Sequence, residues 1–251
     1  MATVLNRTNH LKKDIRWTKI KIFLQILKLF ILFVIYVCSL TFDIWDKFVS
    51  SYIALGYGTY TIFRITYLQK KKSILANGLE GEKYFLKVAE KLPKSYTILT
   101  DLDIGYKGNF SQLDMIVVGD NGVFIIEVKN VRGTITGHVT DHDLTQTKIN
   151  RDGKKYVKTI YNPIKQVETH RERLKDILKS NKINIRIENI VAFVNKDIHL
   201  NLQGKSSTKL FTIRRGKEHS IIQYLVDFKG NITLNKNQKD KIIQSILNAN
   251  K

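Results

Sequence analysis

The side chains best suited to chemistry lie in one short stretch, QLDMIVVGDNGVFIIEVKN, at residues 112–130. Two apolar runs flank the sequence GDNG, a pattern typical of two antiparallel strands joined by a tight turn. Each run nevertheless carries charge at its outer end, Asp114 on one side and Glu127 with Lys129 on the other. This combination makes the outer end of the predicted hairpin the first place to look for a functional site.

The turn decides which of these side chains meet. With residues 120–121 as a two-residue loop, Asp114 faces Glu127 and Gln112 faces Lys129. Strand alternation then places all four side chains on one face of the hairpin, and directly opposed Cβ atoms lie about 4.5 to 5.5 Å apart. The prediction depends on this register, because a slip of one residue would move half of the set to the other face.

Two carboxylates at that separation repel each other unless positive charge lies between them. Lys129 can supply one charge, and a divalent cation such as Mg²⁺ or Mn²⁺ can supply two. Mg²⁺ typically takes one or two protein carboxylates and leaves its other positions to water and phosphate. Asp114 and Glu127 are therefore expected to hold a metal ion that polarises a phosphodiester, while Lys129 orients or deprotonates the attacking water. The alternative is a surface ion pair, because Glu-x-Lys is common on strands.

Three polar side chains outside the hairpin could complete such a site. Glu82 lies one turn ahead of Phe85 in a predicted helix, where a carboxylate can lean over the sheet edge as an outer metal ligand. The alternative is that Glu82 only stabilises the helix, through a favourable interaction with the helix dipole in the first turn. Gln166 and His170 are four residues apart on another predicted helix, so they stack on one face. Gln166 could hydrogen-bond to a phosphate or to Lys129, and the alternative is that both are solvated edge residues.

Hydrophobic periodicity and capping signals predict a series of helices and strands in the C-terminal two thirds of the chain. Asn162 is a good N-cap and Pro163 is favoured at the first helical position, so a helix is expected to begin there. Residues 131–160 are polar and glycine-containing, which favours irregular structure or an edge strand. The other predicted elements are a helix at 78–92, strands at 96–103, 112–118, 123–129 and 187–194, and a helix at 235–250. This order indicates a mixed α/β domain with helices on a central sheet.

The N-terminal third is apolar enough to enter a membrane. Residues 22–42 carry one charge, Lys28, and match the length of a bilayer span, and residues 48–68 are a weaker second span. Basic side chains precede the first run and follow the second, which favours a transmembrane hairpin with both ends in the cytoplasm. One alternative is a cleaved signal peptide, which should have a shorter apolar core and a small-residue cleavage site. The other is a pair of buried core helices.

Charge and cysteine content narrow the class of protein. The formal net charge is +20, and residues 1–72 hold 12 basic and 3 acidic side chains, so the excess is not confined to one tail. A basic globular domain suggests an anionic partner, either nucleic acid or anionic lipid. The clusters DGKK at 152–155 and RRGK at 214–217 are plausible phosphate contacts. The single cysteine, Cys38, excludes an intramolecular disulfide and a cysteine-based metal cage.

Taken together, the motifs resemble a known family. GLEGEKYF, QLDMIVV, GVFIIEVKN, GTITG and NPIKQVETHRERL occur in this order over roughly residues 76–195, and the set is similar to the nuclease-related domain (NERD), a branch of the PD-(D/E)XK nuclease superfamily. The resemblance implies a restriction-endonuclease-like fold, in which a mixed sheet carries the acidic motif beside two helices. It implies that the catalytic positions are Glu82, Asp114, Glu127 and Lys129, with Gln112 and Gln166 nearby, and that Asp114, Glu127 and Glu82 bind the metal. His170 stands where related restriction-type nucleases carry Tyr in a Q-x-x-x-Y helix, which leaves its role open.

These observations combine into one functional prediction. We expect a membrane-tethered, Mg²⁺- or Mn²⁺-dependent nuclease with its catalytic domain facing the cytoplasm. Its expected substrate is nucleic acid, DNA rather than RNA. The expected divisions are a membrane anchor at 1–72, a nuclease domain at 73–200 and a C-terminal α/β extension at 201–251 that packs on the domain. Two alternatives stay open: a catalytically inactive nucleic-acid-binding module, and a membrane-surface scaffold that binds anionic lipid.

Overall fold

The computed structural model contains two compact units. One is helical and comprises His10–Leu79; the other is α/β and comprises Met1–Asn9 with Glu80–Lys251. The residues that the structure describes are 1–5, 9–42, 46–106, 108–149, 152–214, 216, 218–230 and 232–250.

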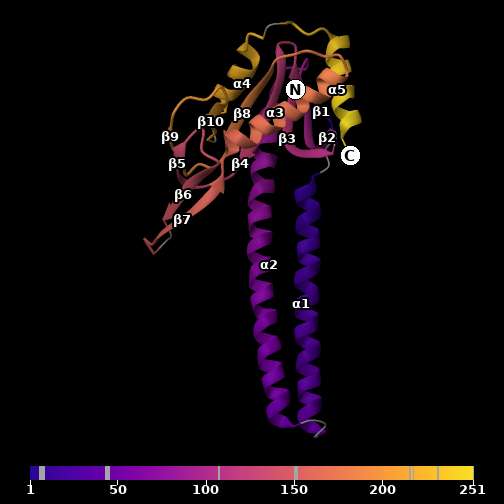
Figure 1. Ribbon diagram of the computed structural model, residues 1–251, viewed down its shortest axis with the longest axis vertical. Helices are drawn as coiled ribbons and strands as arrows, with labels where there is room; N and C mark the ends of the chain where they lie inside the picture. The colour runs from indigo at the N-terminus through magenta and orange to yellow at the C-terminus, as the bar shows by residue number, and fades with distance from the viewer. Residues whose placement is uncertain are drawn as a thin grey trace. The chain divides into compact units, whose positions relative to one another are not determined.

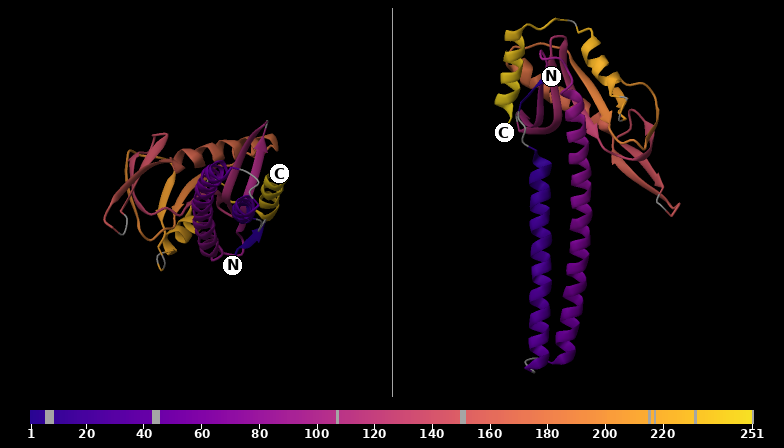
Figure 2. Two further views of the ribbon diagram at one scale, coloured as in Figure 1. Left: turned by 90° about the horizontal axis from the view of Figure 1, so that it is seen from below. Right: turned by 180° about the vertical axis from the view of Figure 1, so that it is seen from behind.

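The helical unit consists of two long antiparallel helices that run side by side (Figures 1 and 2). α1 spans His10–Thr41 and α2 spans Lys47–Ala89, and the hydroxyls of Tyr36 and Ser51 lie 3.3 Å apart between them. Most apolar side chains of α1 are exposed, and within the described residues α1 is the one helix long and apolar enough to cross a bilayer. The predicted arrangement of two helices in a hairpin is therefore present, with one strongly apolar member.

α2 is longer than predicted, because it joins the second apolar run and the helix expected at 78–92 into one element. No proline interrupts the linking residues QKKKSILANG, and most of them are good helix formers. The helix ends at Ala89, shortly before Pro93, as the sequence indicated. Its first part belongs to the helical unit, and residues 80–89 belong to the α/β unit. The link between α1 and α2 at residues 43–45 lies outside the described residues.

A six-stranded mixed sheet is the centre of the α/β unit (Figure 1). The pairs β2–β3 and β3–β4 are antiparallel, while the pairs β1–β2, β4–β8 and β8–β10 are parallel. The sheet order is β1 (Thr3–Leu5), β2 (Thr97–Tyr106), β3 (Asn109–Gly119), β4 (Gly122–Lys129), β8 (Ile187–Phe193) and β10 (Lys209–Thr212). The sequence did not indicate β1, because a three-residue edge strand has too few residues to show a period.

Residues 131–160, where irregular structure or an edge strand was expected, contribute three strands to a second, four-stranded sheet. Its order is β7 (Lys155–Tyr161), β6 (Asp143–Ile149), β5 (Gly133–His138) and β9 (Ile198–Gln203). β5, β6 and β7 are rich in Thr and Lys and lack the apolar alternation that usually marks a strand. β9 shows this alternation at Ile198, Leu200 and Leu202. The β6–β7 ribbon extends away from the six-stranded sheet in all views (Figures 1 and 2).

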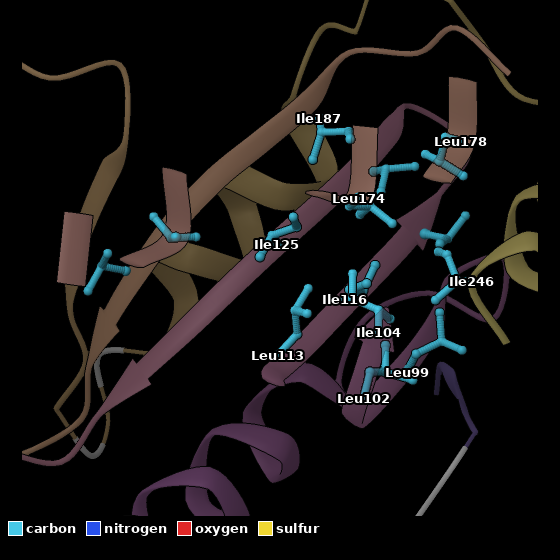
Figure 3. Close-up of a cluster of buried hydrophobic side chains, with 14 of the residues drawn as sticks. Leu99, Leu102, Ile104, Leu113, Ile116, Ile125, Leu174, Leu178, Ile187 and Ile246 are labelled. Carbon is cyan, nitrogen blue, oxygen red and sulfur yellow. The ribbon is translucent and has the colours of Figure 1, made fainter. Parts of the chain in front are cut away.

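Helices cover both faces of the six-stranded sheet. On one face lie α3 (Pro163–Ser180) and α5 (Lys236–Ala249), and on the other lie the end of α2 and α4 (His219–Asp227). The first face holds the larger core, in which Leu99, Leu102, Ile104, Leu113, Ile116, Ile125, Leu174, Leu178, Ile187 and Ile246 pack together (Figure 3). The prediction of a mixed sheet flanked by helices is confirmed.

The capping residues act as predicted at the start of α3. The Asn162 side chain accepts a hydrogen bond from the backbone N–H of Ile164 at 3.0 Å, and Pro163 occupies the first turn. The same amide donates to the carbonyls of Val139 and Asp141. Asn162 therefore caps α3 and also ties its beginning to the loop after β5.

The β3–β4 hairpin has the predicted register. Paired residues run from Met115↔Ile126 to Gly119↔Gly122, which leaves residues 120–121 as the loop. On β4, Val123 and Ile125 belong to the core under α3, so strand alternation places Glu127 and Lys129 on that face as well. The outer end of the hairpin therefore presents its charged side chains toward α3.

Candidate active site

Asp114 lies where the two strands of the hairpin separate. The β3–β4 ladder ends at Met115↔Ile126, and beyond it the Asp114 carboxylate accepts a hydrogen bond from the backbone N–H of Val128 at 2.8 Å. The side chain thus takes the place of the next ladder bond and holds the diverging strands together. This bond also fixes the orientation of the carboxylate, next to the strand that carries Glu127.

Glu127 and Lys129 form a close ion pair beneath α3. Lys129 Nζ lies 2.7 Å from Glu127 Oε1, and the Glu127 side chain is only 2% exposed. Lys129 also donates a hydrogen bond to Gln166 Oε1 on α3 at 2.9 Å. The predicted meeting of the hairpin with the Gln166 helix is therefore present in the structure.

The charges in this cluster shift one another's pKa values. Burial raises the pKa of Glu127, Lys129 opposes that shift, and the charge of Glu82 adds to it. Burial alone would lower the pKa of Lys129, but the carboxylates of Glu127, Asp114 and Glu82 outweigh burial and raise it. Lys129 is therefore an ammonium at neutral pH. The mutual influence also means that Glu82, Asp114 and Glu127 all lie within electrostatic reach of the same lysine.

His170 adds a buried imidazole to the cluster. Its Nε2 atom lies 3.6 Å from Glu127 Oε2, and its Nδ1 atom lies 2.9 Å from Ser111 Oγ. Arg173 donates a hydrogen bond to the same hydroxyl, so the Ser111 proton is directed to Nδ1 and the imidazole proton to Nε2, facing Glu127. Burial, followed by the charges of Arg173 and Lys129, lowers the pKa of His170 to about 4. His170 is therefore a neutral side chain that approaches Oε2 of the carboxylate, whereas Lys129 contacts Oε1.

Glu82 comes from the end of α2, as the sequence suggested. Asn9 donates a hydrogen bond to Glu82 Oε2 at 2.9 Å. Gly81 allows the close approach of the helix, because a Cβ at this position would lie 2.6 Å from the Cβ of Asn130, the residue that follows β4. Sequence reasoning missed Asn9 and Ser111, since neither residue lies in a recognisable pattern. The glycine before Glu82 was the available signal for the close approach.

Gln112 lies apart from this cluster. The predicted cross-strand pair of Gln112 and Lys129 does not form, because the β3–β4 ladder stops before reaching them. Gln112 instead pairs with Asp103 of β2, and its side chain is exposed. The register of the hairpin was thus right near the turn, but its extension to the outer end was wrong.

The donor set suits a divalent ion that is only partly held by protein. Glu127 Oε2 is buried and has no hydrogen-bond partner among the described residues, although a buried carboxylate oxygen normally has one. In the described part of the chain, no three His, Cys, Asp or Glu side chains are grouped closely enough to enclose a metal. Mg²⁺ needs no such cage, because it is usually bound through one or two carboxylates, phosphate and water. Asp114 and Glu127 fit that requirement, with Glu82 nearby.

The predicted phosphate contacts at 214–217 are only partly visible. Arg215 and Lys217 lie outside the described residues, while Lys154 and Lys155 of the other cluster are exposed at the start of β7.

Comparisons with known proteins agree with the geometry. Residues 77–194 match the NERD family, whose description is nuclease-related domain. A stretch of 62 residues is 40% identical to the uncharacterized protein pXO1-01 of Bacillus anthracis, and it covers 24% of this chain and 29% of that protein. The chain thus matches less than a third of that relative's length. No solved structure matches the chain. The matched range contains the hairpin, the end of α2 and all of α3, and residues 77–194 of this chain are a nuclease-related domain.

Proposed function

We propose that this protein is a metal-dependent nuclease that hydrolyses the phosphodiester bonds of nucleic acid, with DNA as the expected substrate. The observation that carries the proposal is the state of Glu127. Its carboxylate is buried between Lys129 and His170, and Oε2 has no hydrogen-bond partner within the described residues. Burying a charged group in this way costs free energy, so a site that keeps it is expected to use it.

The acidic residues supply the metal site in this proposal. Asp114 and Glu127 would hold Mg²⁺ or Mn²⁺, and Glu82, whose charge reaches the same Lys129, would act as an outer ligand through water. When bound, the ion polarises the scissile phosphodiester and offsets the charge that develops in the transition state. The bond from Val128 N to Asp114 Oδ2 keeps that carboxylate oriented before the substrate arrives.

Lys129 then acts as a cation and hydrogen-bond donor. Its raised pKa supports a charged ammonium in the resting site, which favours orienting the water and offsetting phosphate charge over accepting a proton. Gln166 accepts a hydrogen bond from the ammonium and so limits where it can point. The neutral imidazole of His170 contacts Glu127 without adding a second positive charge.

The helical unit supports a membrane anchor. α1 is long and apolar, with only 6% of its most apolar window buried, and basic residues lie on the outer side of both apolar runs. Under the positive-inside rule, a hairpin of α1 and α2 would keep the nuclease domain on the cytoplasmic side. Protease protection in sealed vesicles tests this orientation. The α/β unit should be digested only in vesicles whose cytoplasmic side faces the protease.

The nuclease activity is tested on the full chain in detergent. Labelled DNA and RNA are incubated with the protein in Mg²⁺, in Mn²⁺ and in EDTA, and cleavage should require a divalent ion. Glu127→Gln and Asp114→Asn should lower the rate by about 10³-fold, as expected for removal of charge that stabilises a transition state. Glu172→Gln, which changes an exposed acid on α3, is the matched control and should cleave normally.

The same experiment separates the alternatives. Cleavage that survives Glu127→Gln would show that the site is assigned to the wrong residues. Salt-sensitive binding of nucleic acid without any cleavage would identify a binding module. Binding to anionic vesicles with no preference for nucleic acid would identify a membrane-surface scaffold.

A further inference from the structure

The second sheet carries a group of cations that the proposed active site does not use. Arg132 lies just before β5, Lys148 lies on β6 and Lys158 lies on β7. The strand register places Lys148 opposite Tyr156 and Lys158 opposite Gln146, so these side chains share one face of the ribbon. We refer to Arg132, Lys148, Tyr156 and Lys158 as the basic face.

The cations of the basic face are close enough to affect one another. Gly133 leaves room for the stem of Lys148, because a Cβ at the glycine would lie 3.2 Å from Lys148 Cγ. Burial lowers the pKa of Lys148, and the positive charges of Lys158 and Arg132 lower it further. Like charges held together in this way repel each other. An anion that binds among them would relieve the repulsion.

The outer strand adds aromatic and apolar surface beside the charges. β7 reads KYVKTIY, in which two Lys residues are interspersed with aromatic and β-branched residues. Tyr156, on the same face as Lys148 and Lys158, is 49% exposed, while Val157 is 53% exposed on the opposite face. The ribbon that carries them projects from the sheet in Figures 1 and 2. Single-strand-binding proteins combine these two features, because the cations follow the phosphates and the bases stack on aromatic rings.

One end of the basic face lies close to the proposed active site along the chain. Arg132 follows Lys129 by three residues, so their Cα atoms lie within about 11 Å of each other. Ile135 of the second sheet packs in the same core as Ile125 of β4, and Ile125 lies on the same side of β4 as Glu127. A strand lying along the basic face would therefore reach the side of the sheet on which the acidic cluster lies.

We infer that the basic face binds a single-stranded segment of nucleic acid and leads it to the Glu127 site. Arg132, Lys148 and Lys158 contact phosphates, and Tyr156 stacks on an unpaired base. The inference rests on the nuclease function proposed above and narrows its substrate to nucleic acid with an unpaired strand.

Binding is measured separately from cleavage. The full chain in detergent is titrated with a labelled single-stranded DNA oligonucleotide and with its duplex, in EDTA and over a series of salt concentrations. The triple variant Arg132→Ala, Lys148→Ala, Lys158→Ala should weaken single-strand binding, and the slope of log affinity against log salt should fall by about 2, since each phosphate contact contributes about 0.7. Tyr156→Ala should weaken binding about tenfold or more through loss of stacking, whereas Tyr156→Phe should bind like the wild type.

A matched triple variant separates the contribution of the basic face from that of overall charge. Lys229→Ala, Lys236→Ala, Lys241→Ala removes the same charge from exposed positions of the C-terminal region and should leave the salt slope nearly unchanged. If both triple variants lose binding equally, the effect is one of overall charge and the inference is overturned. It is also overturned if the duplex binds more tightly than the single strand and Tyr156→Ala binds normally.

The outcomes distinguish this inference from the proposed function. If Glu127→Gln abolishes cleavage but the basic-face variants bind and cleave like the wild type, the inference fails and the nuclease remains. If neither the wild type nor any variant cleaves nucleic acid, but only the basic-face variants lose single-strand binding, the nuclease proposal fails and the inferred binding surface remains.

Discussion

The two ends of the β3–β4 hairpin treat their polar groups in opposite ways. At the turn, Asn121 donates hydrogen bonds to the carbonyls of Leu225, Val226 and Phe228 at the end of α4, and Asp120 pairs with Lys239 of α5. At the outer end, the buried oxygen Glu127 Oε2 has no hydrogen-bond partner within the described residues. One hairpin thus has a satisfied end and an unsatisfied end.

If the proposed function is correct, the difference separates polar groups that stabilise the fold from polar groups that bind a ligand. Satisfied buried polar groups stabilise the fold and specify one arrangement, whereas unsatisfied ones cost free energy. The hydrogen bonds and the ion pair at the turn join the C-terminal helices to the sheet, and they give Asn121 and Asp120 partners within the protein. The outer end keeps an uncompensated carboxylate oxygen beside an ammonium, which is an arrangement that substrate or metal can complete. Substitutions at the two ends should therefore change different properties.

The largest effect is expected when the ammonium is removed from the outer end. Lys129→Met should lower nuclease activity by about 10³-fold, because a cation aimed at developing charge is lost. It should also destabilise the metal-free protein by about 3 kcal/mol, since the carboxylate of Glu127 is left buried without its partner. Mg²⁺ should then raise the melting temperature of the variant more than that of the wild type. Differential scanning fluorimetry in EDTA and in Mg²⁺ measures this.

Lys165→Met is the control for that experiment. Lys165 pairs with Glu168 at 3.3 Å on a partly exposed side of α3, and ion pairs in contact with solvent contribute at most about 1 kcal/mol. A Lys129 variant that melts like the wild type and gains nothing from Mg²⁺ would show that the outer end is an ordinary ion pair.

The opposite behaviour is expected at the turn. Asn121→Ala removes the donor for the carbonyls that end α4 and should destabilise the protein by about 2 kcal/mol, the cost of leaving buried polar groups unpaired. Nuclease activity per folded molecule should stay unchanged, because the acidic cluster lies at the other end of the strands. Denaturant unfolding and activity at a low temperature measure the two properties. Asn237→Ala, on the exposed side of α5, is the control and should change neither one; lost activity in folded Asn121→Ala would mean the two ends are coupled.

Sequence reasoning succeeded where short-range rules decide the structure. The GDNG turn fixed the register that brings Asp114 and Glu127 to one end of the hairpin, and the Asn162 cap fixed the start of α3. It failed for Gln112, because the Asp114 side chain takes a backbone N–H of β4 and ends the ladder there. No local pattern announces such a bond.

The other failures have the same physical origin. β5, β6 and β7 are polar strands that are stabilised by pairing with one another, so hydrophobic periodicity gave no sign of them. β1 is only three residues long, and the contact between Asn9 and Glu82 joins residues far apart in the chain. Each of these features depends on tertiary contacts, which override local propensity.

The smallest effect is expected where α2 meets the outer end of the hairpin. In Gly81→Ala the new Cβ would lie 2.6 Å from the Cβ of Asn130, so the helix must shift away from β4. Overpacking of this kind lowers the free energy of unfolding by about 1 to 3 kcal/mol, while the higher helix propensity of Ala raises it by about 1 kcal/mol. The net loss of stability should therefore be about 1 kcal/mol. Because Glu82 follows directly in the helix, nuclease activity should fall by more than this loss of stability explains.

Gly78→Ala provides the matched test on the same helix, one turn earlier. There the new Cβ would meet only the end of the Leu11 side chain, at 3.3 Å, which can move aside. This variant should be as stable as the wild type or slightly more stable, and its activity should not change. If Gly81→Ala behaves like Gly78→Ala, the close approach of α2 to β4 is not needed to position Glu82, and the acidic cluster would have to work with Asp114 and Glu127 alone.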